Sequence, residues 1–171
     1  MEIQKTTPGK FGVNFGLVLG VLMIIISMLI YATDMALKGQ DWPMNIYYVL
    51  FPVTIFYSIN KYKKQNDGLL GVSEAIKTGI IVALISALVY VLYALLFNYV
   101  IDPSYNEQIL EFSTNKIAES DAPLEAKEIS LKMIEFFINP INGSLFWIAM
   151  SLFLGLIYSL TGGLVMKKTE A

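Results

Sequence analysis

The fold of this chain is decided by residues 73–101, which read SEAIKTGIIVALISALVYVLYALLFNYVI. No charged residue interrupts this stretch between Gly79 and Phe97. At a rise of ~1.5 Å per residue, an apolar helix of this length crosses a hydrocarbon core of ~30 Å. The stretch therefore predicts a transmembrane helix.

One edge of this predicted helix carries a small residue at every fourth position. These residues are Ala75, Gly79, Ala83 and Ala87. In lipid, small residues at this spacing let the backbone of a second helix approach closely. We therefore expect this edge to be a helix-packing surface.

The first turn of the same stretch contains two charged residues, Glu74 and Lys77. Ionisable groups inside a membrane often carry protons or ions, so the two residues are a candidate relay. Alternatively, they pair with each other at headgroup depth, and Glu74 caps the positive end of the helix dipole. Their position at the start of a helix longer than the bilayer favours the capping interpretation.

Three further apolar segments complete the predicted architecture. Residues 11–33, 43–60 and 145–166 are each long enough to be a span. The hydrophobic content of 56% and the mean hydropathy of +0.60 are well above those of soluble domains. We therefore predict an all-α integral membrane four-helix bundle, with residues 1–171 forming a single membrane domain.

Small residues recur every fourth position in the first and fourth spans. We expect them to join the edge of the third span in a tight core, with the second span lying more peripherally. The additional packing candidates are Gly12, Gly16, Gly20, Ser151, Gly155, Ser159 and Gly163.

The second span contains Pro52 near its middle. A proline there removes one backbone hydrogen bond and kinks the helix, which makes Pro52 a candidate hinge. The alternative is that Pro52 has no functional role, because proline is common in transmembrane helices.

Residues 102–143 form the one long polar segment. Eight acidic residues and three lysines occur in it, at a spacing that predicts a helical hairpin hinged near Ser120 and Asp121. These acids are candidates for binding Ca²⁺ or a cationic partner. They lack the loop motif that positions oxygens around calcium, so a solvated helix face is the favoured interpretation.

The lysines indicate the orientation of the spans. Lys38 is the one lysine that flanks a span on the side of the polar segment, and long polar loops count little. The positive-inside rule therefore places both termini in the cytoplasm and the hairpin outside, in the cytoplasmic (inner) membrane of a bacterium. The lysines on the opposite side are Lys5, Lys10, Lys61, Lys63, Lys64, Lys167 and Lys168, with Lys77 just inside the third span.

The composition argues against several classes of function. The chain has no Cys and no His, and all 12 of its basic residues are Lys. Thiolate and imidazole chemistry are therefore excluded, and the guanidinium that favours phosphate recognition is missing. No P-loop, nucleophile-elbow or HExxH motif occurs. We expect no enzymatic activity, no cofactor, no bound metal and no nucleic-acid partner.

The chain also resembles a known family. The resemblance lies in Phe15-Gly16 with its apolar continuation, in the Lys-rich turn, in the entry to the third span (residues 71–79) and in Asp102-Pro103. It is similar to a family of small multi-pass membrane proteins, mostly from Bacteroidota, catalogued as domain of unknown function 4199. The resemblance implies a four-helix integral membrane protein and supplies no activity and no site residues.

Two classes of function stay open. The favoured one is a non-enzymatic accessory or structural subunit of a membrane assembly, whose partners are the lipid bilayer and other membrane proteins or further copies of the chain. The alternative is a small transporter or channel, for which Asn14, Pro52, Glu74 and Lys77 are the candidate polar or hinge residues. Against it, no acid or base lies near the bilayer midplane, where transport sites usually are.

Overall fold

The computed structural model describes residues 7–40 and 42–169. Helices account for nearly all of this part, together with one isolated β-bridge, so the prediction of an all-α fold is confirmed. The elements are α1 (Pro8–Ala32), the 3₁₀-helix η1 (Ala36–Lys38), α2 (Trp42–Gln65), α3 (Val72–Leu96), the π-helix η2 (Phe97–Ile101), α4 (Tyr105–Glu119), α5 (Leu124–Ile138) and α6 (Pro140–Met166).

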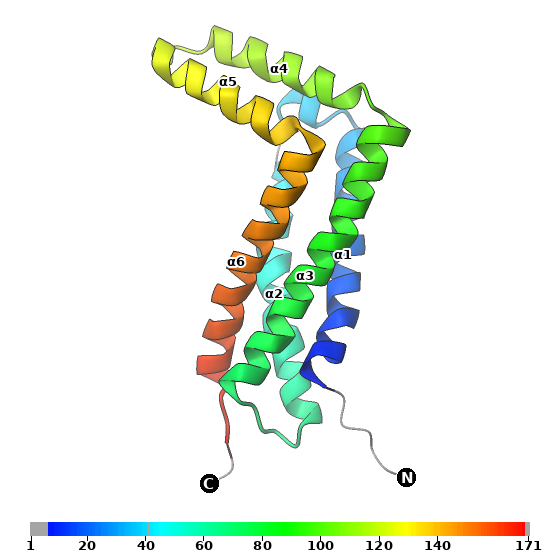
Figure 1. The fold of residues 1–171 in the computed structure, drawn as a ribbon, viewed down its shortest axis with the longest axis vertical. Helices are drawn as coiled ribbons and strands as arrows, with labels where there is room; N and C mark the ends of the chain where they lie inside the picture. Colours follow the sequence, from blue (N-terminus) through cyan, green and yellow to red (C-terminus); the bar gives the residue numbers. More distant parts are fainter. Residues whose placement is uncertain (1–6, 41, 170–171) are drawn as a thin grey trace.

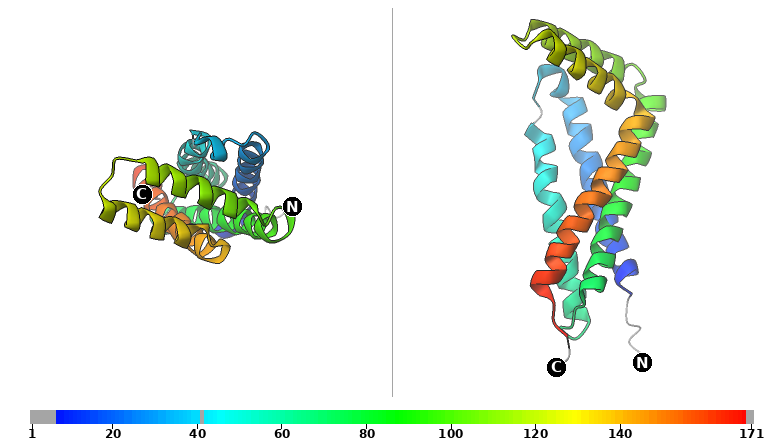
Figure 2. Two further views of the ribbon diagram at one scale, coloured as in Figure 1. Left: turned by 90° about the horizontal axis from the view of Figure 1, so that it is seen from above. Right: turned by 60° about the vertical axis from the view of Figure 1, so that its left-hand side comes forward.

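The four longest helices, α1, α2, α3 and α6, run side by side along the long axis of the molecule (Figure 1). Helices α4 and α5 pack against each other across one end and project beyond it (Figure 2). We call this end the hairpin end. The start of α1 and the end of α6 both lie at the opposite end, which we call the terminal end.

Within the described part of the chain, three helices are long and apolar enough to cross a membrane. They are Pro8–Ala32, Val72–Ile101 and Pro140–Met166, with 25, 30 and 27 residues. This composition indicates a membrane protein. Helix α2 has 24 residues but is not among the three, because tyrosines, asparagines and Pro52 dilute its apolar content.

Local capping makes two of the helices start earlier than the hydropathy pattern predicted. Helix α1 begins at Pro8, because Thr7 Oγ1 accepts a hydrogen bond from the Lys10 amide at 3.4 Å and proline fits a first helical turn. Helix α6 begins at Pro140 instead of 145, because Asn139 Oδ1 accepts from the Ile141 amide at 3.1 Å.

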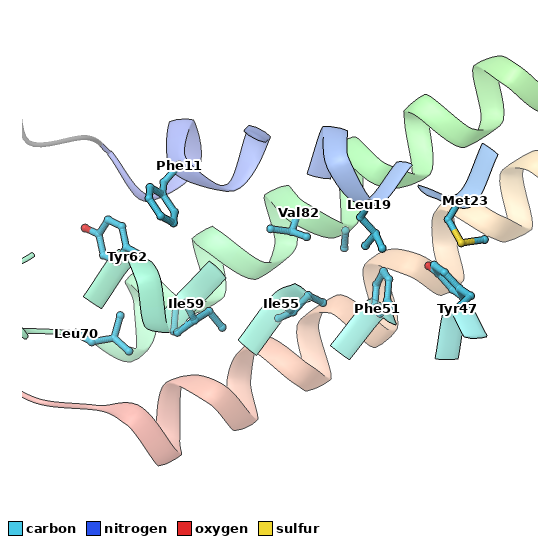
Figure 3. Packing of buried hydrophobic residues seen from close by; sticks show 12 residues of the cluster. Phe11, Leu19, Met23, Tyr47, Phe51, Ile55, Ile59, Tyr62, Leu70 and Val82 are labelled. Atoms are coloured by element: carbon cyan, nitrogen blue, oxygen red, sulfur yellow. The ribbon is translucent and has the colours of Figure 1, made fainter. Parts of the chain in front are cut away.

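The hydrophobic core runs through the middle of the bundle (Figure 3). Large side chains of α2 fill it: Phe51, Ile55 and Ile59 are 0–1% exposed. Leu19 of α1 and Val82 of α3 lie against the same cluster. The most extensive helix contacts join α3 to α1 and α6, as expected, and α2 packs less extensively against the other three. The inner face of α2 nevertheless contributes large side chains to the core, where the other helices present small residues.

The terminal end is closed by contacts between the segments that follow α2 and α6. Leu70 and Lys168 exchange two backbone hydrogen bonds, at 2.8 and 3.0 Å. The Lys63 ammonium donates to the Met166 carbonyl at 2.8 Å and so satisfies one of the last free carbonyls of α6. These bonds tie the end of α6 to the α2–α3 connection.

Candidate functional site

The glycines of α1 pack against branched side chains of α3. A Cβ atom added at Gly16 would lie 2.7 Å from the Ile85 Cβ, and one added at Gly20 would lie 2.7 Å from the Val89 Cβ. One added at Gly12 would lie 2.6 Å from the Thr78 carbonyl oxygen. At each position the missing side chain therefore leaves the space that α3 occupies.

The small-residue edge of α3 faces α6 instead. A Cβ atom added at Gly155 would lie 2.5 Å from the Ala83 Cβ, and one added at Gly163 would lie 3.0 Å from the Ala75 Cβ. One added at Gly79 would collide with the Ser159 Cβ. Further along this edge Ala87 and Ser151 are both buried.

Glu74 joins the start of α3 to the end of α2. Its carboxylate accepts hydrogen bonds from the Gly71 amide at 2.8 Å and from the Tyr62 hydroxyl at 3.1 Å. The first bond satisfies an N-terminal amide of α3, which is the geometry of a helix cap. Lys77 is exposed, and within the described residues no ion pair joins it to Glu74.

The other polar or hinge candidates do not gather with Glu74 into one site. Helix α2 continues through Pro52, which is half-buried, and Asn14 is exposed on α1. In the part of the chain that the structure describes, no hydrogen bond joins any two of Asn14, Pro52, Glu74 and Lys77.

Sequence reasoning missed a polar and aromatic site at the hairpin end. A cavity of 290 Å³ lies between α1, the end of α3 and the start of α4. The Tyr90 hydroxyl lies 3.2 Å from the Ser27 hydroxyl at its wall. Tyr31, Tyr93 and Tyr105 also line it, so its surface is largely aromatic with hydroxyl groups at the edges.

A second cavity of 230 Å³ adjoins the first, towards α5 and α6. Tyr90, Ala94, Asn98 and Asn106 line both cavities and therefore form the wall between them. Trp147 of α6 lines the second cavity only. The two cavities thus meet at a wall that carries two amide side chains.

Hydrogen bonds fix the hairpin above these cavities. The Asp102 carboxylate accepts from the Ser104 hydroxyl at 2.7 Å and from the Tyr31 hydroxyl at 3.0 Å. The bonds from Ser104, and then that from Tyr31, hold the pKa of Asp102 below its ordinary value, so this carboxylate stays charged. The Asn106 amide donates to the Ile138 carbonyl at 2.8 Å and links the start of α4 to the end of α5.

Aromatic contacts also connect α1, η2 and α4 at the hairpin end. The ring of Tyr31 lies 4.8 Å from that of Phe97 and 5.1 Å from that of Tyr105, both in edge-to-face geometry. Burial raises the pKa of the Tyr105 hydroxyl, which is therefore neutral and able to donate a hydrogen bond at neutral pH.

This site combines apolar ring faces with neutral hydrogen-bonding groups, an arrangement suited to binding. Among the described residues, no group of three or more His, Cys, Asp or Glu residues is placed to hold a metal ion. The signal in the sequence was the set of polar side chains near the ends of two apolar runs, such as Ser27, Tyr90 and Asn98. Only the packing of α1 on α3 brings them together.

Comparison with known proteins gives one match. The family model described as "Protein of unknown function (DUF4199)" matches residues 14–168, and this confirms the family predicted from the sequence. No curated protein and no solved structure matches the chain.

Proposed function

The chain belongs to the DUF4199 family of proteins of unknown function, and for this member we propose a role as a non-enzymatic accessory or structural subunit of a membrane assembly. In this proposal α1, α2, α3 and α6 cross the cytoplasmic membrane of a bacterium, with both chain ends in the cytoplasm and the α4–α5 hairpin outside. The observation that carries the proposal is an apolar outer surface around a filled interior.

The outer surface of the long helices is apolar over most of its length. Leu17 and Val21 of α1, Leu92 of α3, and Phe153 and Leu164 of α6 are examples of large exposed side chains. A soluble monomer rarely exposes apolar patches of more than a few hundred Å². A surface of this kind is suited to contact with lipid.

Helix α2 has the features of a fourth span, although its composition is mixed. Its outward face carries exposed side chains such as Val49 and Val53. Two of its polar side chains are buried and have partners: the Tyr47 hydroxyl lies 3.5 Å from the Ser151 hydroxyl, and the Ser58 hydroxyl donates to the Ile55 carbonyl. Internal satisfaction of polar groups is what a bilayer requires of a spanning helix.

The distribution of charge supports the proposed orientation. The terminal end carries Lys61, Lys63, Lys64, Lys167 and Lys168 next to the helix ends, and segment 102–143 carries eight of the 14 acids. Lys5, one of the lysines that the sequence argument counts, lies outside the described residues, as does Asp41.

The packing of the interior favours the accessory role over the transporter or channel. Leu19, Phe51, Ile55 and Val82 fill the centre of the bundle and are at most 1% exposed. Glu74, the main candidate for a relay, is held as a helix cap. In the described part of the bundle, apolar side chains thus occupy the centre.

A topology assay tests the membrane arrangement. A reporter that is active only outside the cytoplasm should be active when fused after Asp41 or within 119–125, and inactive when fused after Lys64 or at Ala171. The reason is that lysines flank the spans mainly on one side. The paired fusions control for expression. An active fusion after Lys64 would contradict four spans, because it would place the α2–α3 connection outside.

Site-specific photocrosslinking from the hairpin tests the accessory role. Leu124 at the start of α5 is 75% exposed, whereas Leu92 on α3 is 73% exposed on the bundle. A photoreactive amino acid in place of Leu124 should give one discrete protein adduct in membranes, because the hairpin is the part of the fold that projects beyond the bundle (Figure 1). The same amino acid in place of Leu92 should react with lipid. Mass spectrometry would identify the partner as another protein or a second copy, and absence of any protein adduct from Leu124 would refute the role.

A further inference from the structure

The second cavity at the hairpin end contains two buried polar atoms without a hydrogen-bond partner. Among the described residues these are the side-chain carbonyl oxygen of Asn98, Oδ1, and the indole nitrogen of Trp147, Nε1. Both residues line the cavity of 230 Å³. Buried polar atoms in folded proteins nearly always have partners, so an unpaired acceptor and an unpaired donor on two residues of one cavity indicate that hydrogen-bonding groups are missing there.

Asn98 is held in place by its own helix. It lies in the π-helical segment η2, and such segments are frequent at functional sites. Its amide nitrogen donates to the Ala94 carbonyl at 2.7 Å. This bond fixes which end of the amide is the nitrogen and leaves Oδ1 as a free acceptor.

Trp147 is held in place by aromatic neighbours. Its ring centroid lies 4.9 Å from that of Tyr47 and 5.2 Å from that of Tyr90. Both free atoms therefore belong to side chains whose positions are fixed by other contacts, which is the preorganisation that a binding site needs.

Charge limits what the cavities can accept. In the described part of the chain, no Asp, Glu or Lys lines either of them. The carboxylate of Asp102 nearby is already bonded to Tyr31 and Ser104. A charged ligand would therefore be buried without a counter-charge, which is unfavourable.

From these observations we propose that the paired cavities bind an uncharged polyol or sugar group. A hydroxyl donates one hydrogen bond and accepts others, so the hydroxyl groups of one such molecule match both the acceptor Asn98 Oδ1 and the donor Trp147 Nε1. The aromatic walls, Tyr90 and Trp147 among them, supply apolar faces for the carbon skeleton of such a group. The group comes either from a free polyol or sugar or from the headgroup of a neutral glycolipid. Only the lipid source rests on the proposed membrane location.

Tryptophan fluorescence tests this proposal on the full chain in a detergent without a sugar headgroup. The chain has two tryptophans, so Trp42→Phe leaves Trp147 as the only fluorophore. Glucose, sorbitol or monomeric octyl glucoside should change the emission of Trp147 saturably, whereas a short-chain phosphocholine should not. Saturation with glucose or sorbitol identifies a free ligand, and saturation with octyl glucoside alone identifies a lipid headgroup.

Two variants show whether the free atoms carry the binding. Asn98→Leu should weaken binding about tenfold, because the acceptor is lost. The matched control Asn14→Leu, an exposed asparagine of α1, should leave binding unchanged. Trp147→Phe keeps an aromatic ring but loses the donor, and its weaker binding would be measured by calorimetry. This second variant keeps the test decisive if Asn98→Leu fails to fold.

Three results would overturn the proposal. They are no saturable response to any of the three hydroxylated probes, equal binding by folded Asn98→Leu and Trp147→Phe, or an equal response to phosphocholine. The first would mean that the cavities contain water only. The assay requires neither a membrane nor a partner protein, so its outcome is independent of the topology and crosslinking experiments.

Discussion

Replacing Gly16 with Leu should abolish the contact between α1 and α3 and leave little folded protein in the membrane. A Cβ atom at this position would lie 2.7 Å from the Ile85 Cβ and 2.9 Å from the Val82 carbonyl oxygen. Neither obstacle is the end of a flexible side chain, so the two helices must separate. The loss of stability should exceed the ~1–3 kcal/mol typical of overpacked cores. Thermal unfolding in mild detergent and the level of protein in membranes would measure it.

Gly9→Leu is the matched control for this substitution. Gly9 lies on the same helix, but a Cβ atom there would meet only the Ile81 Cγ1, at 3.9 Å, which is an ordinary contact. The control should therefore keep a Tm close to that of the wild type. If Gly16→Leu accumulates and unfolds like Gly9→Leu, the claim that α1 and α3 are in close contact at Gly16 is wrong.

Replacing Gly79 with Leu should be as damaging, at the opposite face of α3. A Cβ atom here would collide with the Ser159 Cβ of α6 and lie 3.1 Å from the Ile55 Cγ2 of α2. A leucine would therefore displace two helices at once, and accumulation in membranes should fall to a level near that of Gly16→Leu. Quantitative immunoblotting of membranes would measure this.

A smaller pair of substitutions shows whether the collision with Ser159 is the cause. Gly79→Ala alone should lower stability by about 1–3 kcal/mol. Adding Ser159→Gly removes both the Cβ and the hydroxyl that the alanine would meet, so the double variant should recover most of that loss. Combining Ser159→Gly with Gly16→Leu should give no recovery, because Gly16 of α1 packs against the branched face of α3 and not against Ser159. Equal recovery in both combinations would contradict the packing of α1 and α6 against different faces of α3.

Much of the fold was predictable because it depends on local composition. An apolar run without charge, such as 79–97, forms a helix in any setting that removes it from water, so the all-α fold followed from the sequence. Helix ends were less predictable. The caps at Thr7 and Asn139 involve single side chains whose geometry decides where a helix starts, and hydropathy does not report it.

The pairing of helix faces was not predictable from spacing alone. The spacing of the α1 glycines is equally compatible with packing against the small edge of α3, but that edge packs against α6, and α1 packs against Ile85 and Val89. The spacing of small residues indicates that a helix comes close and does not indicate which helix. That choice depends on the combined shape of all four helices.

The candidate site was the least predictable part. Asn98 and Trp147 are far apart in the sequence, and each resembles an ordinary residue near the end of an apolar run. Their importance depends on two facts that only three-dimensional packing supplies, a shared cavity and the lack of a partner for one atom on each side chain. Glu74 shows the opposite case, since its position in the first turn of α3 already favoured the capping geometry that is observed.

The central place of α3 has a consequence for biosynthesis. Synthesis proceeds at ~5–20 residues per second, so in the proposed membrane setting α1 meets its partner soon after α3 is made, whereas α6 follows several seconds later, after α4 and α5. During that interval the edge formed by Ala75, Gly79 and Ala83 lacks α6, its main partner. A nascent chain that stalls before Pro140 therefore keeps this edge free to pack against other membrane helices. Such a chain is a substrate for membrane quality control as long as α6 has not been synthesised.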